Sequence, residues 1–437
     1  MVAPGLIIAA PASGCGKTTI TLALLRAFRN AGVRVASAKA GPDYIDPGYH
    51  AAASGQVCIN LDGWGMRRET LSGLVGNLGR DTDLVLCEGV MGLFDGAAGG
   101  GGSTADLAAQ TGWPVVLVLD VAGQAASAAA VFEGLARHRA DVDVIGVICN
   151  RVGGPGHERI LKEAFAKVMP VPALIGFVPR QSSLDLPERH LGLVQATEHD
   201  ALDAFLESAA ALIETHVDLQ RLRDGAKASR CEPALVRPLP PLGQKVAVAR
   251  DDAYAFCYPS VLNGWRDAGT AVSFFSPLAD ESPAADADAI YLPGGYPELH
   301  AGRLAANHIF KGGVKDAARR GAAIYGECGG YMTLGEGLVD AEGGRHEMIG
   351  LFPLETSFAA RRLHLGYRRL KTQCPSFLGE AGASAMGHEF HYASVLSEGR
   401  GDSLFLATDA RGENETACGL VSGKVAGSFV HLIDCVS

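Results

Sequence analysis

The 437-residue sequence lacks several features, and each absence excludes a class of protein. No apolar run reaches the roughly 20 residues of a membrane-spanning helix, and the first residues show no basic segment followed by a leader core. The ten cysteines form no CxxC pair and no zinc-like spacing, which favours reduced thiols in the cytoplasm. A formal net charge of −10 provides no general surface for nucleic acid. We therefore expect a cytoplasmic protein with neither a membrane nor a nucleic-acid partner.

The length predicts two or three domains, and the pattern of apolar runs separates two α/β series. Short apolar strands alternate with helical stretches in the first half, which is typical of a parallel sheet wrapped by helices. The expected strands there are 6–10, 33–38, 84–87, 115–119, 144–149 and 173–178, and the expected helices are 18–30, 123–138, 157–168 and 200–216. The second series has expected strands at 245–249, 271–275, 289–292, 322–325 and 427–431. Residues 345–421 between the last two look richer in strands and loops.

The stretch 224–243 contains RPLPPLG and no sustained periodicity, so we interpret it as a linker. The predicted domains are then 1–223 and 244–437.

A phosphate-binding loop follows the first strand. Backbone N–H groups and the helix N-terminus are expected to hold nucleotide phosphates there, with Lys17 neutralising charge and Thr18 ligating Mg²⁺. The usual first glycine of such loops is missing, because Ala10 and Pro11 occupy its possible positions. The expected ATP-binding residues of the loop are Ser13, Gly14, Cys15, Gly16, Lys17, Thr18 and Thr19.

Acidic side chains follow two other strands of this sheet. Asp43 and Asp46 lie in GPDYIDP (41–47), and Glu88 closes the strand before EGVMGLFDG (88–96), which also contains Asp95. The C-terminal ends of parallel strands meet at one edge, beside the phosphate loop, where carboxylates can bind Mg²⁺ or its waters. Asp beside Pro and Gly also commonly caps turns, which is the alternative for Asp43 and Asp46. Asn150 ends another strand, where it suits either adenine recognition or a turn.

The second half contains GECGG at 326–330, after an apolar strand and before a helix-like stretch. This is the layout of a nucleophile elbow, with Cys328 in the position of the nucleophile; a buried structural thiol is the alternative. A thiol needs a base and an oxyanion pocket to attack a carboxamide. His431, expected at the end of the final strand, is the best base, and Gly294, Gly295 and Gly329 are expected to supply oxyanion N–H donors.

The C-terminal half resembles class I glutamine amidotransferase domains with a Cys–His pair. That family usually has Glu two residues after the His, but here the position is Ile433. Across nearly the whole chain, five motifs resemble the cobyrinic acid and hydrogenobyrinic acid a,c-diamide synthase family, which also lacks this Glu. They are GPDYIDP (41–47), EGVMGLFDG (88–96), PERHLGL (187–193), LGYR (365–368) and GHEFH (387–391).

The resemblance implies a dethiobiotin-synthetase-like P-loop domain joined to a flavodoxin-like amidotransferase domain. It implies ATP- and glutamine-dependent amidation of the a and c acetate groups of a corrin ring, through an acyl phosphate and with Mg²⁺. The implied metal site consists of Thr18, Asp43 and Glu88. The implied substrate and acyl-phosphate site consists of Asp43, Asp46, Glu88, Asp95, Arg189, His190 and Arg368. A corrin polyacid requires local cations in an acidic protein, so a cluster of Arg361, Arg362, Arg368 and Arg369 is a second candidate, unless it is a solvated basic face.

Three alternatives stay open on the sequence. Cobyric acid synthases and other glutamine-dependent amide ligases share both halves. A P-loop switch ATPase with an inactive C-terminal domain would release no glutamate, and a corrinoid carrier would leave the phosphate loop unexplained. A homodimer is possible, and the sequence does not decide whether the corrin contains cobalt.

Overall fold

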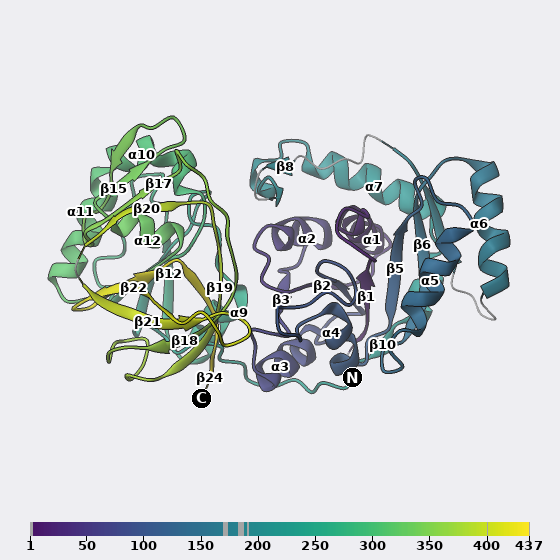
Figure 1. The fold of residues 1–437 in the computed structure, drawn as a ribbon, viewed down its shortest axis with the longest axis horizontal. Coiled ribbons are helices and arrows are strands. Elements are labelled where there is room, and N and C mark those ends of the chain that lie inside the picture. The colour runs from purple at the N-terminus through teal and green to yellow at the C-terminus, as the bar shows by residue number, and fades with distance from the viewer. Residues whose placement is uncertain (1–2, 169–173, 182–187, 190–191, 400, 437) are drawn as a thin grey trace. The chain divides into compact units, whose positions relative to one another are not determined.

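The computed structural model describes residues 3–168, 174–181, 188–189, 192–399 and 401–436, with only the backbone of 188–189 and 192–193. The chain forms two compact units (Figure 1). The first comprises Met1–Trp64 and Arg68–Ala234, and the second comprises Gly65–Arg67 and Leu235–Ser437. The boundary after Ala234 lies inside the expected linker. That interpretation is wrong for its first part, because β10 (Lys227–Ala228) pairs with β1 (Pro4–Ala9) in the first unit.

The first unit is built on one sheet, in the order β3-β2-β4-β1-β5-β6-β7, and β10 pairs with β1 outside this path. Its strands pair in parallel except for β10. The remaining strands of this unit are β2 (Val35–Ala40), β3 (Ile59–Leu61), β4 (Leu84–Glu88), β5 (Val115–Asp120), β6 (Val144–Val152), β7 (Leu174–Pro179), β8 (Glu188–Arg189) and β9 (Gly192–Leu193). The strand order reverses beside β1, which is the point where open α/β sheets bind ligands. The predicted parallel α/β fold is confirmed here.

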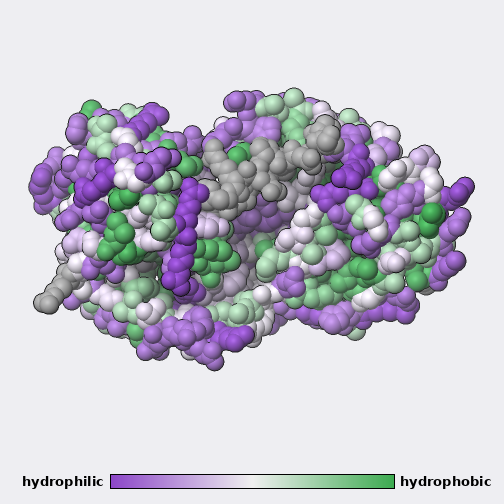
Figure 2. All heavy atoms as spheres, turned by 45° about the horizontal axis from the view of Figure 1, so that its top comes forward, coloured by the Kyte–Doolittle hydropathy of each residue, from purple (hydrophilic) through white to green (hydrophobic). Residues whose placement is uncertain are grey.

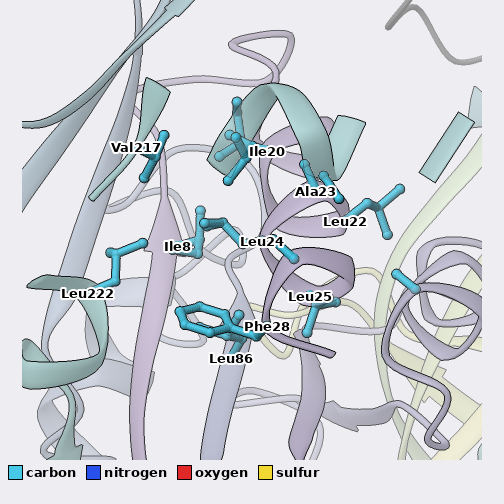
Figure 3. Packing of buried hydrophobic residues seen from close by; sticks show 14 of the residues in the cluster. Ile8, Ile20, Leu22, Ala23, Leu24, Leu25, Phe28, Leu86, Val217 and Leu222 are labelled. Atoms are coloured by element: carbon cyan, nitrogen blue, oxygen red, sulfur yellow. The ribbon is translucent and has the colours of Figure 1, made fainter. Parts of the chain in front are cut away.

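Helices surround this sheet, as Figure 1 shows. They are α1 (Lys17–Asn30), α2 (Asp46–Ser54), α3 (Arg68–Leu78), α4 (Thr104–Thr111), α5 (Ser127–Arg137), α6 (Pro155–Val168), η2 (Ala196–Glu198), α7 (Leu202–His216) and α8 (Leu219–Gly225). Leu24 and Phe28 of α1 pack with Ile8 of β1 and Leu86 of β4 in the buried core (Figure 3). Burying such a side chain stabilises the fold by about 1.5–3 kcal/mol. This packing holds α1, which follows the phosphate loop, against the sheet.

The second unit contains a sheet of the order β12-β11-β13-β14-β23-β22-β21-β18-β19-β24. Its parallel part, β12-β11-β13-β14-β23, has the order 2-1-3-4-5 of flavodoxin-like folds, as predicted. These strands are β11 (Lys245–Ala249), β12 (Ala271–Phe275), β13 (Ala289–Leu292), β14 (Ala323–Glu327) and β23 (Val425–Ser428). The antiparallel part adds β18 (His364–Thr372), β19 (Ser384–His391), β21 (Asp402–Thr408), β22 (Thr416–Ser422) and β24 (Val430–Val436).

A four-stranded sheet and five helices complete this unit among the described residues. The sheet contains β15 (Gly337–Val339), β16 (Arg345–Glu347), β17 (Leu354–Ser357) and β20 (Ser394–Glu398). The helices are α9 (Pro259–Asp267), η3 (Pro297–His300), α10 (Ala301–Ala306), α11 (His308–Arg319) and α12 (Gly329–Leu334). The expectation that 345–421 is rich in strands and loops is confirmed.

The prediction of one closing strand at 427–431 is wrong. β23 ends at Ser428, and β24 begins at Val430. The first pairs in parallel with β14, and the second pairs antiparallel with β19. His431 is therefore the second residue of the last strand and not its end.

None of the described helices is long and apolar enough to cross a membrane. On the face drawn in Figure 2, hydrophilic and hydrophobic residues are interspersed. Such a mixture is ordinary for protein surfaces.

Candidate active sites

The phosphate loop joins β1 to α1, and two glycines give it its shape. Gly14 and Gly16 have φ angles of 79° and 84°, a left-handed conformation that L side chains rarely adopt. A Cβ on Gly16 would lie 2.3 Å from the Asn150 side-chain nitrogen. Asn150 donates from this nitrogen to the carbonyl of Cys15 at 3.0 Å. The structure thus places Asn150 as a brace of the loop, and its expected contact with adenine stays a prediction.

The two side chains that open α1 lie at the C-terminal end of β4. Thr18 Oγ1 donates to Glu88 Oε1 at 2.6 Å, and Lys17 Nζ donates to the carbonyl of Met91 at 2.9 Å. Burial lowers the pKa of Lys17 below its ordinary value. The loop, Thr18 and Glu88 therefore converge at the edge where the sequence predicted them to meet.

Glu88 is the centre of a buried ionic cluster. Its Oε1 accepts from Lys39 Nζ at 2.8 Å, its Oε2 lies 2.6 Å from His50 Nε2, and Lys39 also pairs with Asp46. Glu88 and His50 have no exposed surface. Burial opposes ionisation, but Lys39 and His50 outweigh it and hold the pKa of Glu88 below its ordinary range.

The same cluster sets the charges of its other members. Burial lowers the pKa of Lys39, but the carboxylates of Asp46 and Glu88 raise it well above the ordinary value. Burial raises the pKa of Asp46 to about 6. Burial is likewise outweighed at His50, where Cys58 and Glu88 raise the pKa to about 10. The cluster thus contains a charged Lys39, an imidazolium at His50 and an ionised Glu88.

The sequence analysis missed Lys39 and His50. Lys39 is a charged residue near the end of an apolar strand, which is the same signal that indicated Glu88. The sequence therefore offered a signal for Lys39. His50 gave no such signal, because it lies inside a helix that was not predicted.

Two of the other expected acids have local structural partners. Asp43 Oδ1 accepts from the N–H groups of Ile45 and Asp46 at 2.8 and 3.0 Å, which is the turn-capping alternative. Asp95 Oδ2 accepts from Gly92 N–H at 3.0 Å and shapes its own loop. These contacts leave each carboxylate with further acceptor capacity, so their substrate and metal roles stay predictions.

In the second unit, Cys328 lies at a strained turn between β14 and α12. Its φ and ψ angles are 47° and −103°, a conformation costing on the order of 1–3 kcal/mol for a residue with a side chain. Strain of this kind is characteristic of nucleophile elbows, as the sequence predicted. Cys328 is nevertheless only 3% exposed.

His431 and Cys328 meet over Gly294. A Cβ on Gly294 would lie 2.3 Å from His431 Cε1, 3.2 Å from His431 Nε2 and 3.3 Å from Cys328 Cβ. A Cβ on Gly329 would lie 3.1 Å from the Gly295 nitrogen. The structure therefore brings the predicted nucleophile, base and three glycines together.

Both members of this pair are neutral at physiological pH. Burial, and then the field of Glu298, raises the pKa of the Cys328 thiol above its ordinary value. Burial, and then His388 and His391, lowers the pKa of His431 to about 3. His431 is thus an unprotonated imidazole that can accept the thiol proton. It is not half of a preformed thiolate–imidazolium pair.

The four expected arginines do not all lie on one face. Arg368 and Arg369 are consecutive in β18 and point to opposite faces, because side chains alternate along a strand. Arg368 Nη2 pairs with Glu389 Oε2 at 2.7 Å, whereas Arg361, Arg362 and Arg369 are exposed. Arg362 and Arg368 both lie close enough to His364 to lower its pKa, so part of the expected cluster stays a prediction, without Arg369 on the same face. His190 lies outside the described residues, as does the side chain of Arg189.

Glu389 also belongs to a second group of donor atoms, together with His364 and His391. His391 Nε2 lies 2.9 Å from Glu389 Oε1, and the rings of His364 and His391 stack. Burial raises the pKa of Glu389, but His391 and Arg368 outweigh it and lower the pKa to about 2. Because Arg368 and His391 already compensate the carboxylate, we assign no metal here.

The two halves match two family models. Residues 6–194 match the CobQ/CobB/MinD/ParA nucleotide binding domain, and residues 245–434 match the CobB/CobQ-like glutamine amidotransferase domain. The fold and the two sites thus define a nucleotide-binding domain fused to a glutamine amidotransferase domain.

Full-length relatives narrow this class. Hydrogenobyrinate a,c-diamide synthases from a Sinorhizobium species, Brucella abortus and Rhodobacter capsulatus are 54%, 55% and 50% identical to this chain. Each alignment covers 98% of this chain and 98% of the relative. The chain belongs to the hydrogenobyrinate a,c-diamide synthase family, and the predicted family resemblance is confirmed.

Proposed function

We propose that this protein uses ATP and glutamine to amidate the a and c acetate carboxylates of hydrogenobyrinic acid, a corrin without cobalt. The observation that carries the proposal is Cys328 at a strained elbow beside His431, in a chain similar over 98% of its length to hydrogenobyrinate a,c-diamide synthases. An intact elbow favours a glutaminase over a switch ATPase or a corrinoid carrier. The names of the relatives favour hydrogenobyrinic acid over cobyrinic acid.

Glutamine hydrolysis begins when His431 Nε2 takes the proton of the Cys328 thiol. The sulfur then attacks the carboxamide carbon, and the N–H groups of Gly295 and Gly329 are suited to stabilise the oxyanion. The C–N bond breaks as His431 returns the proton to the leaving nitrogen, which releases ammonia. Water hydrolyses the γ-glutamyl thioester, yielding glutamate and the free thiol.

The first unit activates the corrin carboxylate, which is too poor an electrophile for ammonia. The carboxylate oxygen attacks the γ-phosphorus of ATP, ADP leaves, and an acyl phosphate forms. Lys17 and the loop N–H groups offset the negative charge of the phosphates. Ammonia then attacks the acyl carbon, releasing phosphate and a proton and leaving the amide.

The residues beside Lys17 fit a magnesium ion. Thr18 Oγ1 and Glu88 Oε1 are adjacent hard oxygen donors, the type that Mg²⁺ prefers. Thr18 would ligate the ion, and Glu88 would hold it directly or through water. Asp43, three residues before Asp46 of the ionic cluster, is the further acid that we propose for this metal site. A magnesium ion held by these residues would offset the negative charge of the nucleotide phosphates.

The carboxylate side chains of the corrin require positively charged residues to bind them. We propose that Arg189 and His190 in the PERHLGL motif serve as such residues, and that Asp46 and Asp95 shape the acyl-phosphate site. Arg368 is engaged by Glu389, so its role in binding would require it to exchange this partner. The ten free cysteines support a reducing, cytoplasmic location, and a homodimer stays a prediction.

Mass spectrometry of parallel incubations tests the function. Hydrogenobyrinic acid and cobyrinic acid are each incubated with protein, Mg-ATP and glutamine, and two successive acid-to-amide mass changes are expected with hydrogenobyrinic acid. Cys328→Ser should lose the reaction with glutamine and keep it with ammonium. Glutamate release without amidation of either corrin would refute the substrate, and absence of both products would refute the amidotransferase.

A further inference from the structure

The position where class I amidotransferases usually have a glutamate is apolar in this chain. Ile433 is 1% exposed and lies two residues after His431 in β24, where the pairing of this strand with β19 shifts register. An isoleucine can neither accept the Nδ1 proton of an imidazole nor stabilise an imidazolium. If His431 acts as the base, a different residue has to perform this task.

Glu327 is the carboxylate nearest to Nδ1 in the described ion pairs of His431. Its Oε2 lies 3.8 Å from His431 Nδ1, whereas the Nε2 edge of the ring faces Gly294 and Cys328. The imidazole therefore lies between the nucleophile and this carboxylate, with one nitrogen toward each. Glu327 reaches this position from β14, where it is the residue immediately before the elbow.

Two hydrogen bonds fix the Glu327 side chain. Its Oε1 accepts from the N–H of Leu432 at 3.1 Å, and its Oε2 accepts from the hydroxyl of Tyr291 at 2.7 Å. Leu432 directly follows His431, so the first bond ties the carboxylate to the strand that carries the base. Glu327 is 2% exposed.

We propose that Glu327 is the positioning residue for His431 and takes the place of the glutamate that Ile433 replaces. The inference rests on the proposed glutaminase activity of Cys328 and His431. At 3.8 Å the contact is longer than a hydrogen bond, and it closes when His431 becomes charged. The thiol proton moves to Nε2, the Nδ1 proton stays on the ring, and the Glu327 carboxylate stabilises the imidazolium without taking a proton.

The surroundings of Glu327 make its charge sensitive to pH. Burial raises the pKa of Glu327 to about 7, although Tyr291 and the Leu432 N–H oppose the shift. The groups facing it are Tyr291, Tyr325, Cys257, Cys328 and His431, none of which is cationic at rest. On its far side, Glu327 lines a mainly apolar cavity of about 100 Å³ with Trp265 and Leu432. His431 itself is also faced by His388, His391 and Glu389 of β19.

Glu327→Gln tests the proposal in the full-length enzyme. Gln keeps an acceptor for the Leu432 N–H, but its amide donates to Nδ1 and favours the wrong tautomer of His431. We expect the kcat for glutamine hydrolysis to fall about 10²- to 10⁴-fold with little change in KM, and ammonium-dependent amidation to persist. Glu327→Asp, which retains the carboxylate, should recover part of the rate.

Glu398→Gln is the matched control. Glu398 also accepts from a buried tyrosine, Tyr331, at 2.6 Å, but it lies on β20 of the four-stranded sheet and not on the strands that carry Glu327 and His431. This variant should hydrolyse glutamine at the wild-type rate. The wild-type kcat should rise with pH through about 7 as Glu327 ionises, and this limb should disappear in Glu327→Gln. A Glu327→Gln enzyme with wild-type kcat and the same pH profile would overturn the proposal.

A second measurement does not depend on how Glu327→Gln folds. In ¹⁵N-histidine-labelled wild-type protein, with His431→Asn used for assignment, His431 should carry its proton on Nδ1 at neutral pH. A proton on Nε2 would overturn the proposal, because the nitrogen facing Cys328 would then be unable to accept the thiol proton. A failure of the proposed function is distinguishable, since it would leave Cys328→Ser with full glutamine-dependent activity.

Discussion

Gly294 shows how a missing side chain shapes the thiol site. A Cβ on Gly294 would lie 2.3 Å from Cε1 of His431, which is too close for the imidazole ring to keep its place. We predict that Gly294→Ala displaces His431 and lowers the kcat for glutamine hydrolysis by about 10²-fold or more, because a 1 Å misplacement suffices for such a loss. Ammonium-dependent amidation should remain, and assays with the two nitrogen donors would separate these outcomes.

Gly312→Ala provides the control for this variant. Gly312 lies in α11, and a Cβ there would have no heavy atom within 4 Å. Both activities should stay at the wild-type level. Equal glutaminase rates in the two alanine variants would show that the ring does not occupy the space beside Gly294.

Lys39 offers a second prediction for a single residue. Lys39→Met removes the ammonium from two buried carboxylates, Asp46 and Glu88. Removing one partner of a buried ion pair costs about 3–5 kcal/mol, so hydrogen exchange at β2 should accelerate strongly. Lys227→Met, which breaks an exposed pair with Asp143, should change stability by about 1 kcal/mol or less. Equal exchange in the two variants would contradict the proposed role of the cluster.

Sequence patterns located those residues that have a local signature. Cys328 is flanked by glycines, and Glu88 ends an apolar strand, so each could be predicted before the structure. Glu327 precedes the elbow by one residue, yet nothing in the sequence indicates that its carboxylate faces His431 from another strand. Such a pairing depends on tertiary structure, which brings together residues 104 positions apart.

At the level of elements, the apolar runs predicted most strands of both parallel sheets within a few residues. The run GSFVHL at 427–432 was the exception, because its hydrophobic pattern is continuous although the chain changes its pairing partner after Ser428. Short helices such as α2 escaped prediction because Ala-rich stretches between glycines have a weak periodic signal. The functional candidates in these helices, including His50, were therefore missed.

The helix α2 is predicted to lose stability at alkaline pH. In the folded state the pKa of His50 is raised from 6.5 to about 10, so the stabilisation is fully present below about pH 6.5. It is lost as the pH rises through about 10, at about 1.4 kcal/mol for each unit of the pKa shift. Protection factors of α2 amides between pH 6 and 10 measure this loss. His50→Gln should flatten the dependence; an unchanged slope would show that His50 is not its source.

The whole molecule combines two chemistries whose intermediates are easily wasted. Free ammonia is protonated in water, and an acyl phosphate is hydrolysed. In the resting state Cys328 and His431 are both neutral, the first because burial raises the pKa of the thiol and the second because burial lowers the pKa of the imidazole. Because the thiolate is the attacking form of cysteine, we infer that a neutral pair hydrolyses glutamine slowly until ligands of the first unit change the site.

This reasoning predicts that ligands of the first unit accelerate the thiol site. Mg-ATP with the corrin acid should raise the wild-type kcat for glutamine hydrolysis about tenfold or more, a change of about 1.4 kcal/mol in the barrier. Lys17→Ala, which weakens phosphate binding, should keep the basal rate and lose the stimulation, and EDTA should have the same effect on the wild type. Glutamate release measured with and without ligands decides the matter. A basal rate already equal to the stimulated rate would mean that the elbow needs no signal from the nucleotide, and that ammonia is wasted whenever glutamine is present.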